Sequence, residues 1–205
     1  MRDYHFYEPA AGHGLPHDPF KAIVAPRPIG WISTMDGRGN ANLAPYSFFN
    51  AVADNPPMIA FSSSLRKDSL TNAEETGVFG WNMATRALAG AMNATSAPLP
   101  HGEDEFAAAG LAKVPGRVTA VPLVADSPAA LECRVTRIQR LADIDGVEID
   151  QWLVIGQVVG VHIDRALLAD GLFDTAAAGP ILRAGYRDKY AAIDPDAMFA
   201  MNRPT

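Results

Sequence analysis

The stretch of residues 40–82 constrains the fold of this chain more than any other segment. It contains two strand-like runs, Ala41–Asn50 and Pro57–Ser63, which are joined by a turn that carries Asn55-Pro56-Pro57. A short helix is expected directly after the second run. Strands that are separated by only a short turn pair antiparallel, whereas parallel strands need a long crossover. The stretch therefore predicts a hairpin-based sheet.

Strand patterns recur along the rest of the chain, and the predicted helices are short. Residues 36–40 (Asp-Gly-Arg-Gly-Asn) are typical of a hairpin turn, because glycine supplies positive φ and Asp or Asn tolerates it. Gly156 and Gly160 lie inside the longest predicted strand and indicate bends or a close backbone approach. No glycine-rich dinucleotide fingerprint follows a predicted strand, which argues against a Rossmann fold. The pattern favours a mainly β protein with short helical insertions, an antiparallel β-barrel with further strands over 29–34, 78–83, 130–141 and 152–163.

Groups that bind anions are concentrated where the second strand of the 40–82 stretch ends. Backbone N–H groups at a helix start have no internal partner, and the helix dipole favours an anion there. Gly77 is expected to end this helix. The sequence therefore predicts a phosphate cradle made of the hydroxyls of Ser62, Ser63 and Ser64, the cations of Arg66 and Lys67, and a helix start with Ser69 as its N-cap.

The run Ala41–Asn50 mixes polar and apolar residues on both of its faces, unlike an ordinary core strand. Such a strand is expected to line a polar cavity. A phosphorylated ligand with a planar ring also needs an aromatic wall and polar groups at the edge of the ring. The candidates for the wall are Trp31, Phe48 and Trp81, and those for the edge are Asn42, Ser47, Asn50, Asn82 and the backbone of Ala44–Tyr46. Spacing alone does not name the cofactor.

Composition limits the classes of function. The chain has 205 residues, 48% of them hydrophobic, and a formal net charge of -6, which argues against a general nucleic-acid binder. Its single cysteine, Cys133, cannot form an internal disulfide and is predicted to be a small core residue, so a reducing, cytoplasmic location is expected. No signal peptide and no run approaching ~20 apolar residues is present, so no membrane partner is expected.

The remaining side chains offer little for direct catalysis. His13 and His17 have the spacing of metal ligands on a helix, but Gly14 and Pro16 make a helix unfavourable, so no metal site is expected. No convincing nucleophile is found, and catalytic residues stay unassigned. A second basic and aromatic cluster in the tail reads either as an exposed face or as an arm across a cofactor or partner, and it contains Arg183, Tyr186, Arg187, Lys189 and Tyr190.

Several short motifs, taken in order, resemble the flavin reductase-like family, whose members have an FMN-binding split β-barrel. The resemblance covers about residues 20–190. The first motifs are Arg27-Pro-Ile-Gly-Trp-Ile-Ser-Thr34, Gly39-Asn-Ala-Asn-Leu-Ala-Pro-Tyr-Ser-Phe-Phe49, Asn55-Pro-Pro-Met-Ile59 and Lys67-Asp-Ser-Leu-Thr-Asn72. Later ones are Gly102-Glu-Asp-Glu-Phe106, Ala130-Leu-Glu-Cys133 and Ile155-Gly-Gln-Val-Val-Gly-Val-His162.

The resemblance implies a Greek-key split barrel over residues 21–170, flanked by an N-terminal arm (1–20) and a C-terminal arm (171–205). It implies FMN, less often FAD, bound without a covalent bond in a homodimer. The isoalloxazine ring would contact Ala44, Pro45, Tyr46 and Ser47, beside Asn42 and Asn82. The phosphate would meet Ser62, Ser64, Lys67 and Ser69, with Arg66 as a further candidate, while Ser63 is a candidate from the spacing alone. The implied activity is reduction of flavin by NAD(P)H, with electrons passing to free flavin, oxygen or a partner monooxygenase.

One departure from the family keeps an alternative open. Many NADH-dependent members carry Gly-Asp-His before the long strand, and this chain has Glu148-Ile-Asp-Gln-Trp152, with Gln151 at the position of the histidine. The alternative is a flavin-binding protein that transfers electrons or stores flavin without its own NAD(P)H site. A third possibility is a different phosphorylated ligand such as pyridoxal phosphate. His162 keeps a family-like position and is predicted to be structural.

Overall fold

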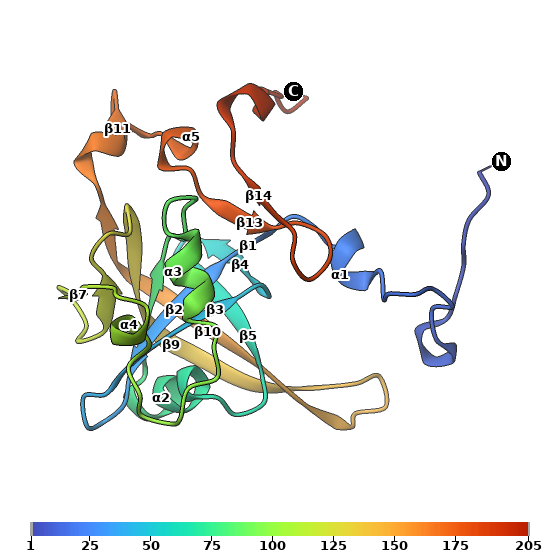
Figure 1. The fold of residues 1–205 in the computed structure, drawn as a ribbon, viewed down its shortest axis with the longest axis horizontal. Helices are drawn as coiled ribbons and strands as arrows, with labels where there is room; N and C mark the ends of the chain where they lie inside the picture. Colours follow the sequence, from blue (N-terminus) through green and yellow to red (C-terminus); the bar gives the residue numbers. More distant parts are fainter. Residues whose placement is uncertain (1, 205) are drawn as a thin grey trace.

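Seven antiparallel strands form the main sheet of the protein in a computed structural model, which describes residues 2–204. Their spatial order is β3-β2-β6-β9-β10-β5-β4 (Figure 1). The strands are β2 (Gly30–Met35), β3 (Ala41–Tyr46), β4 (Phe49–Asp54), β5 (Pro57–Ser64), β6 (Val78–Asn82), β9 (Ala129–Ala142) and β10 (Glu148–Ile163). The mainly β class predicted from the sequence is confirmed.

The other elements are short. Three small sheets accompany the main sheet. In the first, β13 (Ile181–Arg183) lies between β1 (Arg27–Pro28) and β14 (Tyr190–Ala192). The other two pair β7 (Lys113–Pro115) with β8 (Pro122–Val124), and β11 (Leu168–Ala169) with β12 (Leu172–Phe173). The α-helices are α1 (Phe20–Ile23), α2 (Asp68–Thr76), α3 (Ala89–Ala94), α4 (Glu105–Ala108) and α5 (Thr175–Ala178). Three 3-10 turns span Pro9–Ala11, Arg165–Leu167 and Pro195–Ala197. No helix in residues 2–204 is long and apolar enough to cross a membrane.

The predicted single strand Ala41–Asn50 is wrong, because two strands occupy it. β3 ends at Tyr46, the chain bends at Ser47 and Phe48, and β4 begins at Phe49. β3 pairs with β2, whereas β4 pairs with β5, so the bend carries the chain from one end of the strand order to the other. The Phe49 ring stacks on Trp81 with the ring centroids 5.9 Å apart, which draws the second half of the run away from the line of β3. An alternating pattern does not reveal such a bend, since residues on both sides of it alternate equally well.

The helix that follows β5 starts differently from the prediction. α2 begins at Asp68, Lys67 occupies the N-cap position without a side-chain cap bond, and Ser69 is therefore not the N-cap. The Ser69 hydroxyl instead accepts a hydrogen bond from Asn42 Nδ2 at 2.8 Å. The predicted end is confirmed: Gly77 has a φ of 71°, in the left-handed region that glycine favours, and its N–H donates to the Ala73 carbonyl.

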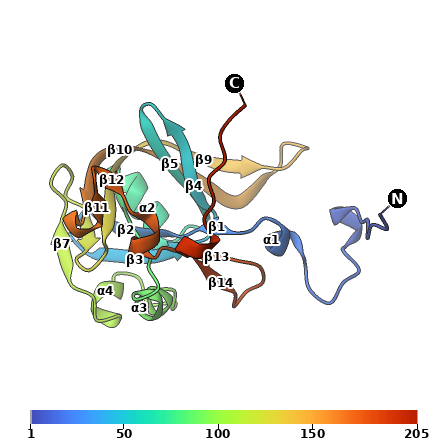
Figure 2. The ribbon, with the colours of Figure 1, turned by 90° about the horizontal axis from the view of Figure 1, so that it is seen from above.

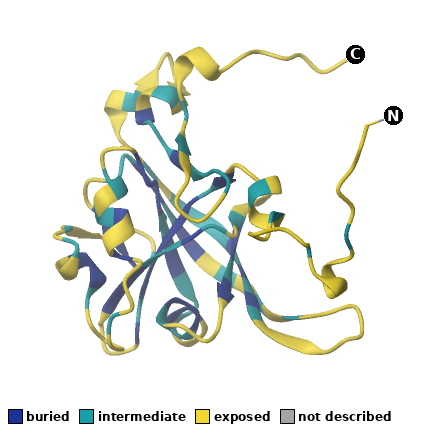
Figure 3. Cartoon of the chain, turned by 45° about the vertical axis from the view of Figure 1, so that its right-hand side comes forward, coloured by how far each residue is buried: buried dark blue, intermediate teal, exposed yellow. Residues whose placement is uncertain are grey.

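The core of the barrel is built around aromatic side chains, and the buried residues lie along the inner strands of the sheet (Figure 3). Phe61, Phe79 and Ile32 are fully buried in one cluster, and Trp31 and Phe106 lie in a second. A Cβ on Gly156 would lie 2.3 Å from the Phe79 ring, so the close approach predicted for this glycine is confirmed. Cys133 is buried in the first cluster, and burial raises the pKa of its thiol to about 12, as expected of a core residue.

A buried carboxylate holds β9, β10 and the loop 116–119 together. Glu132 on β9 is fully buried and accepts hydrogen bonds from the N–H groups of Arg117, Val118 and Thr119 at 2.6–2.9 Å. His162 Nε2 on β10 lies 2.7 Å from Glu132 Oε1, the oxygen that also accepts from the Arg117 N–H, which agrees with a structural role for that histidine. We call this set the Glu132 anchor.

The two ends of the chain extend away from the sheet (Figure 2). Residues 2–20 are largely exposed, and the last residues near the C-terminus are exposed as well (Figure 3). The C-terminal part of the chain is nevertheless attached to the barrel. Its strand β13 pairs with β1, and the Ile181 side chain is buried in the core. The division of the chain at residues 20 and 170 stays a prediction.

Candidate functional site

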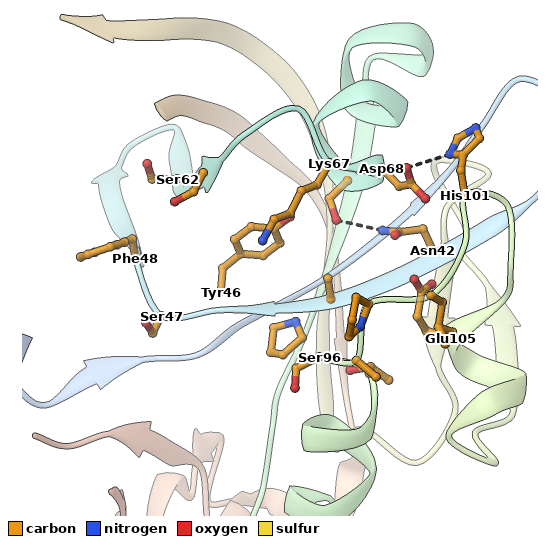
Figure 4. Close-up of a pocket in the computed structure, with 18 residues that line it drawn as sticks. Asn42, Tyr46, Ser47, Phe48, Ser62, Lys67, Asp68, Ser96, His101 and Glu105 are labelled. Carbon is orange, nitrogen blue, oxygen red and sulfur yellow. Dashed lines mark hydrogen bonds and ion pairs between the residues drawn. The ribbon is translucent and has the colours of Figure 1, made fainter. Parts of the chain in front are cut away.

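A cavity of about 600 Å³ lies between the end of β3, the junction of β5 with α2, and the segment 95–105 (Figure 4). Its volume falls in the range of roughly 300–1,000 Å³ that is usual for small-molecule sites. We call it the Lys67 cavity. It is lined by Asn42, Ala44, Pro45, Tyr46, Ser47, Phe48, Ser62, Ser64, Lys67, Asp68, Ser69, Thr95, Ser96, Ala97, Pro98, Leu99, His101 and Glu105.

The structure brings most of the predicted site residues together in this one cavity. Strand β3 and the bend after it supply one wall, and the β5–α2 junction supplies another. The predicted site residues that line the cavity are Asn42, Ala44, Pro45, Tyr46, Ser47, Ser62, Ser64, Lys67 and Ser69.

Four of the predicted polar residues lie outside the cavity lining. Asn50 is exposed on β4, where its Oδ1 accepts from the Ala51 N–H at 2.9 Å. Ser63 is fully buried on the opposite face of β5 from its neighbours, and its hydroxyl donates to the Leu65 carbonyl at 3.3 Å. Arg66 forms an ion pair with Glu74 of α2. Asn82 is fully buried at the end of β6, where its amide donates to the Trp31 carbonyl and accepts from the Val124 N–H.

Of the three aromatic residues proposed as a wall, only Phe48 lines the cavity. Trp31 is fully buried, and its Nε1 donates to Thr95 Oγ1 at 3.0 Å. Trp81 stacks on Phe49 within the sheet. Trp31 still contributes indirectly, because its hydrogen bond fixes Thr95, which is part of the lining.

Hydrogen bonds leave the hydroxyl protons of two serines available to a ligand. Ser62 Oγ accepts from Gln151 Nε2 at 2.5 Å, and Ser69 Oγ accepts from Asn42 Nδ2 (Figure 4). A hydroxyl that accepts a bond keeps its own O–H to donate. Lys67 points into the same space and has no carboxylate partner among residues 2–204. This side of the cavity is therefore a set of donors around a free positive charge.

Tyr46 adds a buried polar group to the same wall. Its ring packs on Phe61, and burial raises the pKa of its phenol. Its hydroxyl lies near those of Ser63 and Ser69 but has no hydrogen-bond partner among residues 2–204. A buried hydroxyl without a partner costs about 1–3 kcal/mol, so it favours a ligand or water that would satisfy it.

The cavity lining also includes two carboxylates that the sequence did not indicate, Glu105 on α4 and Asp68 directly after Lys67. Glu105 begins the short helix α4, yet it is buried and accepts a hydrogen bond from the Leu43 N–H at 3.0 Å. Burial raises the pKa of Glu105, against the effect of that hydrogen bond. His101 Nδ1 lies 2.8 Å from an Asp68 oxygen at the rim. The acids at the start of α4 were the available signal, but their burial depends on the loop 95–104, which has little regular structure.

Gln151 lies at the donor side of the cavity. It pairs in register with Ser64 across β10 and β5, and its Oε1 accepts from Ser64 Oγ at 2.7 Å. Its side chain thus positions the Ser62 and Ser64 hydroxyls. Among residues 2–204, no group of His, Cys, Asp and Glu is arranged to hold a metal ion.

Comparisons with known proteins agree with this geometry. The model of the family described as "flavin reductase like domain" matches residues 24–179. Component B of nitrilotriacetate monooxygenase from Bacillus cereus is 31% identical, with a TM-score of 0.82, over 89% of this chain and 90% of that one. The 2-nitrobenzoate 2-nitroreductase NbaA of Pseudomonas fluorescens is 25% identical, with a TM-score of 0.79, over 91% and 89%. A split barrel domain protein of Shewanella frigidimarina is 26% identical, with a TM-score of 0.78, over 89% and 90%. The predicted split barrel is confirmed.

Proposed function

This chain belongs to the flavin reductase like family, and on that premise we propose that it binds FMN in the Lys67 cavity and transfers electrons from NADH or NADPH. The coarser part, a flavin-related oxidoreductase function, follows from the family. The observation that supports FMN binding in this cavity is the Lys67 ammonium, which lies among hydroxyl groups at the start of α2.

The donor side of the cavity fits the phosphate of a mononucleotide. Lys67 would supply the charge, and Ser62 and Ser69 would donate their hydroxyl protons, while the Ser64 hydroxyl donates to Gln151 Oε1. The first N–H groups of α2 also have no partner within the helix, and the helix dipole favours an anion at this end. Charge-assisted hydrogen bonds of this kind are about twice as strong as neutral ones.

The ring would lie along the end of β3. Ala44 and Pro45 offer an apolar surface, and the backbone around Tyr46 and Ser47 offers hydrogen-bonding groups to the polar edge of a flavin. Pro45 has no N–H to donate, which keeps this part of the strand from pairing fully with another edge. The flavin, when bound, would supply the hydride chemistry, while these residues hold and orient it.

The similar proteins suggest two kinds of electron acceptor. One is a component of a monooxygenase and another is a nitroreductase, according to their names. We propose that this chain likewise passes electrons to a second protein, to oxygen or to a small acceptor. No nucleophilic side chain is required for such a transfer.

We also propose a homodimer, as the family resemblance implies. The hairpin of β9 and β10 extends away from the rest of the sheet (Figure 1) and carries the exposed apolar side chains of Ile144, Val147 and Ile149. Apolar side chains gathered on a protruding hairpin favour contact with another protein surface. Light scattering after size-exclusion chromatography would measure the mass, and a monomer at micromolar concentration would contradict this proposal.

Rapid mixing of the FMN-loaded protein with NADH or NADPH tests the electron donor. Bleaching of the flavin absorbance within seconds is the expected result. The alternative function, an electron carrier or flavin store without a nicotinamide site, is favoured by Gln151 at the position of the family histidine. Flavin that is reduced by dithionite but by neither nucleotide would establish the alternative.

A further inference from the structure

A second cavity of about 360 Å³ adjoins the Lys67 cavity. The two cavities share the segment Pro45–Ser47 at the end of β3 and the side chain of Ser96. A ligand in the second cavity would therefore touch the same segment that we propose to hold the flavin ring. We call it the Arg183 cavity, and it is lined by Ile29, Pro45, Tyr46, Ser47, Asn93, Ser96, Arg183, Arg187 and Tyr190.

The charges of the Arg183 cavity are positive and incompletely neutralised. Neither Arg183 nor Arg187 forms an ion pair within the part of the chain that the structure describes. The nearest acid in sequence, Asp188, lies 3.1 Å from Lys189 Nζ, although the charge of Arg183 also helps to lower the pKa of Asp188. Burial and the charge of Arg183 lower the pKa of Arg27. The cavity therefore has a positive local potential that an anion would relieve.

The small sheet of β1, β13 and β14 fixes the position of this charge. Arg183 pairs in register with Arg27 on one side and with Tyr190 on the other. Its guanidinium lies over the Tyr190 ring, 4.6 Å from the ring centroid. Such a contact orients the guanidinium and leaves its N–H edge free for a planar oxyanion. Arg183 and Arg187 both line this cavity, and arginine is over-represented where a phosphate or carboxylate is bound through two hydrogen bonds.

We infer that Arg183 and Arg187 form a subsite for the oxyanion, a phosphate or a carboxylate, of the second substrate, whose reactive end then meets the flavin at Pro45–Ser47. The inference rests on the proposed flavin function. The inference assigns different roles to two regions. Gln151 positions the Ser62 and Ser64 hydroxyls at the proposed phosphate site of the flavin. Arg183 and Arg187 would bind the substrate that exchanges electrons with the flavin.

Calorimetric titration of FMN-loaded protein with NADP+ and, separately, with 2-nitrobenzoate tests the subsite. The variants are Arg187→Gln, which alters an exposed side chain in a turn, and Arg183→Gln. Lys189→Gln is the matched control, because it removes the same charge from the same loop at a position outside the cavity lining. The visible spectrum of each sample reports its flavin content.

The expected result is a rise of roughly tenfold in the Kd of one probe in both arginine variants, with little change in Lys189→Gln. A rise for NADP+ assigns the oxyanion to a nucleotide phosphate, and a rise for 2-nitrobenzoate assigns it to a carboxylate. Kd values that stay within about twofold for both probes, or that change equally in the control, would overturn the subsite. Protein that takes up no flavin would instead overturn the proposed function, and the titrations of that flavin-free protein would still decide on the subsite by the same comparison.

Discussion

The Glu132 anchor and the Lys67 cavity are both polar, but their hydrogen bonds are organised in opposite ways. Glu132 is fully buried and receives bonds from three backbone N–H groups, the Thr119 hydroxyl and His162. In the Lys67 cavity, the Lys67 ammonium has no carboxylate partner within residues 2–204, and the Tyr46 hydroxyl has no hydrogen-bond partner. Polar groups that satisfy one another hold a structure together, whereas unsatisfied ones mark a place for a ligand.

The two buried glutamates show the same contrast in their pKa values. Burial works to raise the pKa of Glu132, but the hydrogen bonds from His162 and the 117–119 backbone outweigh it and lower the pKa to about 2. Glu105 receives one hydrogen bond from another residue's backbone, the Leu43 N–H, and there burial prevails and raises the pKa. The number of donors around a buried carboxylate therefore decides whether its charge stabilises the fold.

The largest effect is expected from Glu132→Ala. The change removes a fully buried carboxylate and leaves three backbone N–H groups and His162 without their acceptor, so the free energy of unfolding should fall by about 3–5 kcal/mol. Urea denaturation measures it. Glu148→Ala is the control, because that glutamate forms an exposed ion pair with Arg140 and should cost less than about 1 kcal/mol. Equal losses in the two variants would contradict the structural role of the Glu132 anchor.

The lowered pKa of Glu132 also predicts how stability depends on pH. The folded-state pKa, about 2, lies below the ordinary value of 4.5, so the folded state prefers the charged form. The stabilisation is therefore present above pH 4.5 and is lost as the pH falls towards about 2. Thermal unfolding of the wild type and Glu132→Gln over this range should show a difference that shrinks as the pH falls. A difference that is constant with pH would contradict this assignment.

An intermediate effect is expected from Lys67→Ala, and it concerns ligand affinity. Removing a charge-assisted contact to the phosphate should weaken FMN binding by about 1.5–3 kcal/mol, with little change in stability. Quenching of flavin fluorescence measures the affinity. Arg66→Ala is the matched control, because the neighbouring cation pairs with Glu74 outside the cavity lining. If Arg66→Ala weakens binding as much as Lys67→Ala does, the phosphate is not held by Lys67 as proposed.

The smallest effect is expected from Glu105→Gln. Because burial raises the folded-state pKa above 4.5, ionisation of Glu105 removes stability as the pH rises from 4.5 through the folded-state pKa. Glutamine stays neutral and can still accept the bond from the Leu43 N–H, so the variant should be more stable near neutral pH, by less than about 1 kcal/mol. Thermal unfolding at pH 4 and pH 8 checks this. A variant that is less stable than the wild type at pH 8 would show that the charged form is favoured.

The predictable parts of the site are local in sequence. Ser62, Ser64, Lys67 and Ser69 lie within eight positions, so a strand end followed by a helix start places them together. The bend at Ser47 and Phe48 was not predictable, because it depends on contacts of Phe49 with distant strands. The wall from Thr95 to His101 was missed for the same reason: Trp31 fixes Thr95 from 64 residues away.

The structure separates some predicted residues from the cavity where one residue type can serve two roles. Ser63, Arg66 and Asn82 have suitable chemistry for a flavin site, but the direction of their side chains takes them into the core or onto α2. A sequence gives the residue types at the ends of strands, and the packing of the barrel decides which of them face the cavity.

Titration of the flavin-free protein with FMN, followed by visible absorbance and flavin fluorescence, tests the central claim most directly. The account predicts saturable uptake, with a shift of the flavin absorbance bands and with weaker binding in Lys67→Ala than in Arg66→Ala. Protein that takes up neither FMN nor FAD, while it remains folded and stable, would contradict the account.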